Sequence, residues 1–128
     1  MSENLLICIG DGDNIGDVID FYLLSENLAE ASKFSFKVKA AIEKIAEFAQ
    51  NEMNASLVYV AGDDICFTVQ ANLNLLSNLV CYSNFFLKTT GKTMSFGVGQ
   101  TSVEAVVSLR KAKVSGKGRV INFRGGDN

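Results

Sequence analysis

Residues 58–69, VYVAGDDICFTV, place two adjacent carboxylates, Asp63 and Asp64, between two apolar runs. The runs are rich in β-branched and aromatic residues, and Gly62-Asp63 between them is a typical tight-turn pair. The stretch therefore predicts a β-hairpin with both acids at its tip. Because desolvating an unpaired carboxylate is costly unless a cation or hydrogen-bond donors compensate it, this pair of acids requires an explanation.

Outside the hairpin, apolar residues alternate between the helical period and the strand period. Thr101-x-x-Glu104 is a capping box that opens the last helix, which ends by Gly116. The pattern predicts strands at 4–10, 55–61, 64–69, 92–99 and 119–123, and helices at 18–24, 33–51, 71–88 and 101–116. Loops are predicted at 11–17 and 25–32, and residues 1–3 and 124–128 are predicted to fray.

This order of elements predicts one domain, residues 1–128, of the α+β class with a ferredoxin-like (RRM-like) plan. We expect an antiparallel sheet of about five strands with helices packed on it. A right-handed crossover makes the first two strands parallel with a gap between them, and the third strand fills that gap. The end of the first strand, at Asp11, then lies beside the start of the third, at Asp63 and Asp64. Three carboxylates are therefore expected to converge at one edge of the sheet.

The composition is that of an ordinary globular protein of 128 residues, with 48% hydrophobic and 20% charged residues. A net charge of −2 gives no general attraction to nucleic acid or to an anionic membrane. Apolar runs such as 57–61 are too short to cross a bilayer, and the first strand begins too early for a leader peptide to precede it. We expect a cytoplasmic protein without a membrane partner.

The chain contains no histidine, which excludes Ser-His-Asp, Cys-His and histidine-based metal chemistry. Its three cysteines, Cys8, Cys66 and Cys81, lie in apolar stretches without CxxC spacing, so we expect buried free thiols. An enzyme of this composition works with carboxylates, lysines, arginines, hydroxyls, the backbone and a metal that they hold.

Converging carboxylates are typical ligands of a hard divalent cation. Two such anions 4 Å apart repel by about 4 kcal/mol at an effective dielectric near 20. Oxygen-only ligands favour Mg²⁺ or Mn²⁺, which also bind substrate phosphates. The simpler alternative is a pair of solvated turns. A calcium loop starting at Asp11 is disfavoured, because its twelfth position holds Tyr22 rather than glutamate.

A basic segment, LRKAKVSGKGRV at 109–120, surrounds two glycines at the end of the last helix. Cations at a helix C-terminus interact favourably with the helix dipole, which is sufficient to explain Lys111 and Lys113. The alternative is a functional one, in which lysines hold the triphosphate of a substrate.

Taken together, ICIGDGDNIGD, YVAGDDICF and SFGVG…LRKAKVSGKGRVI resemble the motifs of a palm domain. That domain is shared by GGDEF diguanylate cyclases, class III adenylyl cyclases and the polymerase subunit of type III CRISPR complexes. In size and in its GDD form the chain is most similar to the stand-alone minimal CRISPR polymerases, which are implicated in bacterial anti-phage signalling. The resemblance covers nearly the whole chain in order.

The resemblance implies a catalytic, metal-binding set made of Asp11, Asp63 and Asp64, with the Gly12 carbonyl as a further oxygen ligand. Asp13, the second acid of the D-x-D motif, is expected to orient the site or to contact metal in some states only.

The same resemblance implies that Lys113 and Lys117 reach the triphosphate. The backbone N–H groups of Asn14, Ile15 and Gly16 lie at a helix N-terminus, which is also suited to phosphate.

Two departures from the diguanylate cyclases bear on the substrate. The positions that read guanine in those enzymes hold Ile19 and Leu28 here, and no RxxD feedback motif precedes the hairpin. Adenine, as in the CRISPR polymerases, is therefore the expected base.

The expected function is a metal-dependent nucleotidyltransferase that condenses NTPs, ATP foremost, into a cyclic di- or oligonucleotide messenger read by a separate effector. One small palm holds one NTP, so we expect a homodimer. The alternatives are a mononucleotide cyclase and a non-catalytic palm that senses nucleotides. A nuclease or a templated polymerase is disfavoured, because the net charge is negative and no basic strand with interspersed aromatic residues offers a track for nucleic acid.

Overall fold

The computed structural model describes residues 4–127. Residues 1–3, which were expected to fray, and residue 128 lie outside the described residues. The elements, in chain order, are β1 (Leu5–Gly12), α1 (Ile15–Leu24), α2 (Leu28–Met53), β2 (Ser56–Val60), β3 (Asp64–Gln70), α3 (Leu75–Thr90), β4 (Met94–Gly99), α4 (Ser102–Val114), β5 (Val120–Asn122) and β6 (Gly126–Asp127).

The strands form one sheet in the order β2-β3-β1-β4-β5-β6. Strand β3 lies between β2 and β1 and is antiparallel to both, so the predicted split arrangement is confirmed. Strands β4 and β5 are parallel, which makes the sheet mixed rather than wholly antiparallel. The predicted α+β, ferredoxin-like class is confirmed.

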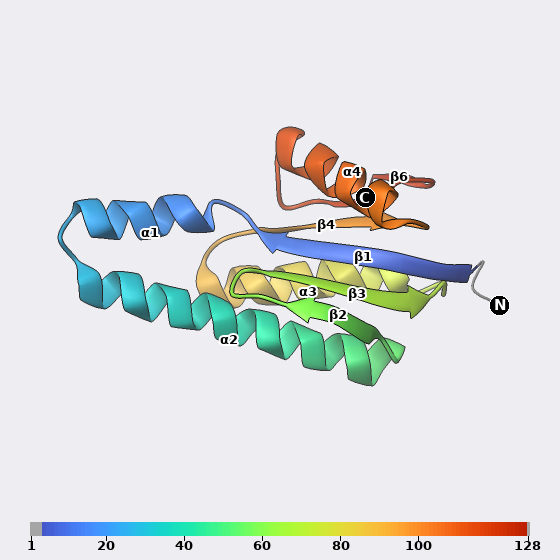
Figure 1. The fold of residues 1–128 in the computed structure, drawn as a ribbon, viewed down its shortest axis with the longest axis horizontal. Coiled ribbons are helices and arrows are strands. Elements are labelled where there is room, and N and C mark those ends of the chain that lie inside the picture. Colours follow the sequence, from blue (N-terminus) through green and yellow to red (C-terminus); the bar gives the residue numbers. More distant parts are fainter. Residues whose placement is uncertain (1–3, 128) are drawn as a thin grey trace.

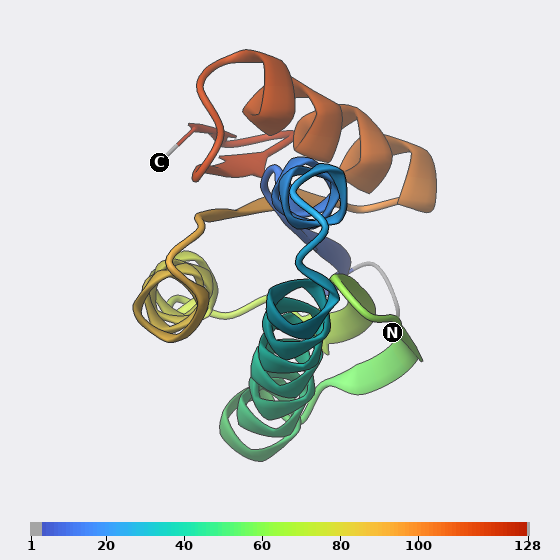
Figure 2. The ribbon, with the colours of Figure 1, turned by 90° about the vertical axis from the view of Figure 1, so that its left-hand side faces the viewer.

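Helices cover both faces of the sheet, and α1 extends beyond its end. Figures 1 and 2 show α2 and α3 on one face and α4 on the other, with α1 following the carboxyl end of β1. The larger core lies under α2 and α3 and includes Ile42, Phe67 and Phe86, all fully buried. A smaller cluster around Ile9 and Ala105 lies under α4. The carboxyl end of β1 therefore lies where α1, α4 and the β2–β3 hairpin meet.

Strand β4 is buried on both faces, whereas its alternating pattern predicted a half-buried strand. The reason is the close approach of α4, which Gly97 permits: a Cβ at this position would lie 2.3 Å from both the Ala105 carbonyl oxygen and the Leu109 nitrogen. The face of β4 that carries Gly97 therefore packs against α4 instead of facing solvent.

Three predicted irregular segments have regular structure. In the predicted loop 11–17, strand β1 continues to Gly12 and α1 already begins at Ile15 instead of residue 18. Helix α2 begins at Leu28 instead of residue 33, because the Asn27 side chain accepts a hydrogen bond from the Glu30 N–H (3.2 Å) and Ala31 is buried. Residues 126–127, expected in the frayed tail, pair with β5 as strand β6.

Two further sequence expectations concern the thiols and the membrane. The three cysteines are free, as predicted, but Cys81 is exposed whereas Cys8 and Cys66 are buried. Among the described residues, no helix combines the length and apolarity that a membrane crossing requires.

Candidate active site

The β2–β3 hairpin brings its acidic tip to the end of β1, as the sequence predicts. The Ala61 N–H donates to the Asp64 carbonyl (2.8 Å), which closes a two-residue loop at Gly62-Asp63. The Gly12 N–H donates to the Asp63 carbonyl (2.9 Å), and Asp11 pairs in register with Asp64. Backbone pairing alone therefore makes the three acidic positions neighbours.

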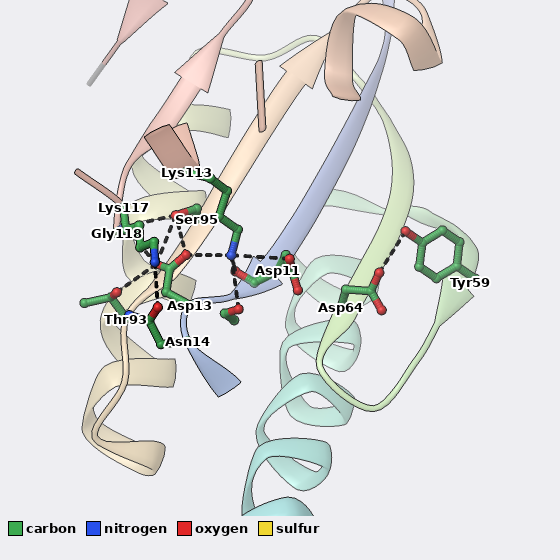
Figure 3. Close-up of polar contacts among 11 residues, drawn as sticks. Asp11, Asp13, Asn14, Tyr59, Asp64, Thr93, Ser95, Lys113, Lys117 and Gly118 are labelled. Atoms are coloured by element: carbon green, nitrogen blue, oxygen red, sulfur yellow. Dashed lines mark hydrogen bonds and ion pairs between the residues drawn. The ribbon is translucent and has the colours of Figure 1, made fainter. Parts of the chain in front are cut away.

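The carboxylates themselves have different partners. Asp11 forms an ion pair with Lys113 (Oδ2–Nζ 3.3 Å), and Asp64 Oδ2 accepts a hydrogen bond from the Tyr59 hydroxyl (3.2 Å). Figure 3 shows Asp11 beside Lys113 and Asp64 turned towards Tyr59. Within residues 4–127 no three acidic or thiol side chains gather closely enough to form a ready metal site. Binding of one cation by all three aspartates therefore requires some of these side chains to turn.

The pKa of Asp11 is raised, first by burial and then by the neighbouring acids. Burial raises the pKa of Asp11, Lys113 lowers it, and the charges of Asp63 and Asp64 raise it further, so that the net shift is upward. A cation placed between these carboxylates would relieve this repulsion.

The donor set fits a hard divalent cation. It consists of carboxylate oxygens and the Gly12 carbonyl, without histidine or paired cysteine, as Mg²⁺ and Mn²⁺ prefer. In this structure the Gly12 carbonyl accepts a hydrogen bond from Lys113 Nζ (3.1 Å), so a metal there would have to share or replace that contact.

Asp13, by contrast, is fully buried and surrounded by donors. Its carboxylate accepts hydrogen bonds from Thr93 Oγ1 (2.7 Å), Ser95 Oγ (2.9 Å) and the Gly118 N–H (2.8 Å), and it pairs with Lys113 Nζ (2.6 Å). Burial alone would raise the pKa of Asp13, but these donors outweigh burial and lower it. We refer to these five residues as the Asp13 cluster, and it holds Asp13 as a structural carboxylate.

Lys113 is a fixed cation in this arrangement. Besides the two carboxylates, its Nζ donates to the main-chain oxygens of Asp11 (3.2 Å) and Gly12 (3.1 Å). An ammonium has three donors, and these oxygens engage all of them. Lys113 therefore ties α4 to the end of β1, a contact that neither sequence alternative, the helix dipole or the triphosphate, included.

Lys117 contacts Asn14, which lies at the helix N-terminus that was predicted to bind phosphate. Its Nζ donates to Asn14 Oδ1 (2.5 Å), and both residues have left-handed backbones, with φ of 65° and 61°. Ile15 and Gly16 follow in the first turn of α1, where backbone N–H groups have no partner within the helix. The structure thus gathers Asn14, Ile15, Gly16 and Lys117 at one point.

Two cavities adjoin the carboxylates. The hairpin pocket, about 270 Å³, is lined by Ile15, Gly16, Ile19, Ser35, Val38, Gly62 and Asp63. The α4 pocket, about 300 Å³, is lined by Asp11, Val106, Leu109, Arg110 and Lys113. Each pocket therefore includes one of the predicted catalytic aspartates.

Several residues of the site were missed from the sequence. Thr93 and Ser95 looked like the solvent side of a strand, although their alternation marks one face. Tyr59 and Ser35 carried no motif, and Arg110 was predicted only as part of the basic segment 109–120, without a role of its own. The register of the hairpin would have predicted Tyr59, because this residue pairs with Cys66, two positions after Asp64 on β3.

Comparison with solved structures identifies the class of this fold. The chain is similar to the Csm1–Csm4 cassette crystallised with cA4 (TM-score 0.69, 23% identity) and with one ATP (TM-score 0.70, 23% identity). The first match covers 91% of this chain and the second 92%, but the chain spans only 20% of the cassette chains. It is also similar to the GGDEF domain of DgcB from Caulobacter crescentus in complex with c-di-GMP (TM-score 0.65, 14% identity), covering 94% of this chain and 78% of that one. The chain therefore has the palm fold that these structures share.

The family follows from the sequence match. Residues 7–123 match the family model of mCpol, the minimal CRISPR polymerase domain, and the chain belongs to this family. A search of curated proteins found no significant match. The expected resemblance is therefore confirmed, and membership places the chain among polymerase- and cyclase-like palm domains.

Proposed function

We propose that this protein is a metal-dependent nucleotidyltransferase that condenses ATP into a cyclic di- or oligonucleotide messenger, in bacterial anti-phage signalling through a separate effector. The observation that carries the proposal is the register of Asp11 with Asp64, with Asp63 in the adjoining pocket. These acids lie at the carboxyl end of β1, beside the N-terminus of α1, whose free N–H groups suit a phosphate.

The proposed reaction is the attack of a 3′- or 2′-hydroxyl of one nucleotide on the α-phosphate of another. The new O–P bond forms as the bond to pyrophosphate breaks, and the hydroxyl proton is lost to solvent. Asp11, Asp63 and Asp64 would hold Mg²⁺ or Mn²⁺, with the Gly12 carbonyl as a further ligand. Such ions, when bound, acidify the attacking hydroxyl and neutralise charge on the phosphoryl group. The residues themselves contribute positioning.

The hairpin pocket suits the base of the nucleotide under attack. Its lining is mainly apolar, and Ser35 and Asp63 are the residues in it with polar side chains. Ile19 lines this pocket, and Leu28 is 72% exposed and does not. Guanine presents more polar groups on its pairing edge than adenine, so a largely apolar pocket leaves more of them unpaired. This supports adenine.

Lys117 and the first turn of α1 are the proposed contacts of the triphosphate. Lys117 is exposed and carries its charge to the Asn14 side of the site. The N–H groups of Ile15 and Gly16 add donors at the positive end of the helix dipole. Lys113 contributes to phosphate binding only by exchanging one of its main-chain contacts.

A homodimer is part of the proposal. A ring of two nucleotides contains two equivalent bonds, and two protomers related by a two-fold axis offer two equivalent sites. The mass of the particle in solution tests this directly.

The deciding experiment is chromatography and mass spectrometry of the products formed from each NTP, with Mg²⁺ or Mn²⁺ and no added nucleic acid. We expect a cyclic di- or oligonucleotide from ATP, and none with EDTA. A cyclic mononucleotide would identify a mononucleotide cyclase instead. Absence of any product from a protein that binds ATP and metal would identify a nucleotide sensor.

A further inference from the structure

We infer that α1 and α4 form the interface of the proposed homodimer, with α1 of each protomer packed against α4 of the other. This inference rests on the proposed function, because it names the surface on which two protomers, each with one NTP, come together. The two helices have exposed faces whose apolar side chains and charges complement each other.

The outer face of α4 is apolar. The helix packs on the sheet through small buried residues, and its opposite side exposes four valines at helical spacing: Val103, Val106, Val107 and Val114. Valine is a weaker helix former than the charged residues that usually occupy a solvent-facing helix, so these side chains do not stabilise α4 by themselves. We refer to them as the valine stripe. An exposed apolar stripe along a helix indicates contact with another surface.

A cation lies within the valine stripe. Arg110 falls between Val107 and Val114 in the helical spacing, and it is exposed. It makes no hydrogen bond or ion pair with any residue in the range 4–127. Packing α4 against α4 of a second copy would bring the two Arg110 charges together, and like charges across an interface are costly. The stripe therefore requires a partner surface that is apolar and carries an acid.

The outer face of α1 has both properties. Ile19 and Tyr22 pack against the larger core, and on the opposite side of the helix lie Asp17, Phe21 and Leu24. Phe21 is 64% exposed and Leu24 is 85% exposed. Asp17 is exposed and without a hydrogen bond or ion pair to the described residues, and α1 contains no basic residue. Helix α1 thus offers the apolar surface and the acid that the valine stripe requires.

The positions of the two helices allow both contacts at once. Figure 1 shows α1 and α4 along the upper side of the molecule. Helix α1 begins at Ile15, just after β1, and Lys113 ties α4 to the end of β1 through the Asp11 main-chain oxygen (3.2 Å). In a two-fold dimer each contact is made twice, α1 on the partner's α4 and α4 on the partner's α1. The axis then passes near the carboxyl ends of both β1 strands, which brings together two sites with one NTP each.

The test is sedimentation velocity of the full chain and of two charge-reversal variants, Asp17→Lys and Arg110→Glu. Each variant alone places like charges in both contacts, so we expect its dimer to be weakened by about tenfold or more. An equimolar mixture of the two restores the wild-type affinity, because a dimer with one chain of each kind has opposite charges in both contacts. Lys88→Glu, an equal charge reversal on an exposed residue of α3, is the control and dimerises like the wild type.

The outcomes separate this inference from the proposed function. A monomeric wild type, or single variants that dimerise as tightly as the wild type, overturns the interface even if product is made from ATP. Variants that are folded by circular dichroism and weakened alone, but not restored by mixing, also overturn it, because α1 would then not face α4. A dimer restored by mixing, in a protein that makes no product from ATP, supports the interface and overturns the synthase.

Discussion

Asp11 and Asp13 lie two residues apart in the chain, yet their carboxylates have opposite surroundings. Asp13 has three hydrogen-bond donors and an ammonium around it, and its pKa is lowered. Asp11 shares that ammonium, faces the charges of Asp63 and Asp64, and has a raised pKa. The protein surrounds one carboxylate with donors, whereas burial first, and then the neighbouring acids, disfavour the charge of the other.

The difference separates structure from function at this edge of the sheet. A buried charge that the chain itself compensates rigidifies the surrounding elements, and here it ties β1, β4 and the loop after α4 together. Asp11 and Asp64 have one side-chain partner each, Lys113 and Tyr59, so their carboxylates keep oxygen sites for a ligand, and the cost of keeping such acids together is a sign of function. The predictions below change one side of this comparison at a time.

The largest effect is expected from Asp13→Asn. The substitution leaves the donors around position 13 without their charged partner, and breaking such a buried pair costs about 3 kcal/mol of unfolding free energy. This is the lower end of the usual range, because Lys113 keeps Asp11 as a partner. Urea denaturation should show a lower midpoint with an unchanged slope.

Asp11→Asn is the matched control, with the same chemical change two residues earlier. Because the raised pKa of Asp11 means that its charged form is disfavoured in the folded protein, neutralisation should leave the stability unchanged or raise it. Equal destabilisation by both substitutions would break the comparison.

Asp63→Asn tests the acids that are proposed to bind metal. Its carboxylate is a proposed metal ligand, so we expect at least a hundredfold loss in the rate of product formation, about 2.7 kcal/mol in activation free energy. Its stability should match the wild type, since the Asp63 side chain makes no hydrogen bond or ion pair with residues 4–127.

Asp20→Asn on α1 removes the same charge outside both pockets and should retain full activity. Turnover that survives in Asp63→Asn would remove this acid from the reaction.

The fold was largely predictable, because its deciding signals are local. The turn at Gly62-Asp63 and the strand patterns on either side fix the hairpin, and the right-handed crossover then fixes which strand lies beside Asp11. These rules gave the observed pairing of Asp11 with Asp64.

The side-chain arrangement was less predictable, because it depends on packing between distant elements. Nothing in the alternation of Thr93 and Ser95 distinguishes solvent from a buried carboxylate until α4 covers β4. The role of Lys113 likewise follows from where α4 lies, since its oxygen partners come from residues about a hundred positions earlier. The start of α2 was missed because the apolar spacing is sparse before Phe34, and the cap at Asn27 was not considered.

Thr93→Val tests how much a single neutral donor contributes to the Asp13 cluster. The substitution removes the 2.7 Å hydrogen bond to Asp13 while leaving its other donors, and we expect a loss of about 1.5 kcal/mol in unfolding free energy. Thr89→Val, at the end of α3 and without a hydrogen bond from its hydroxyl to the described residues, is the matched control. Equal stabilities of the two variants would show that Asp13 does not depend on Thr93.

The smallest effect concerns a carboxylate contact away from the site, between Tyr82 and Glu52. The buried Tyr82 hydroxyl donates to Glu52 (2.7 Å), so Tyr82→Phe should cost about 1 kcal/mol, less than any change in the Asp13 cluster. Burial and then Glu52 raise the pKa of Tyr82 above its ordinary 10.0. Because the folded protein keeps this proton longer than the unfolded chain, the stabilisation is present below pH 10.0 and is lost as the pH rises above it.

Urea denaturation at pH 8 and at several values above pH 10 measures this effect. The difference in stability between the wild type and Tyr82→Phe should shrink as the pH rises. Tyr22→Phe, whose hydroxyl makes no hydrogen bond with residues 4–127, should track the wild type at pH 8. A gap between Tyr82→Phe and the wild type that stays constant with pH would mean that the Glu52 contact does not hold the Tyr82 proton.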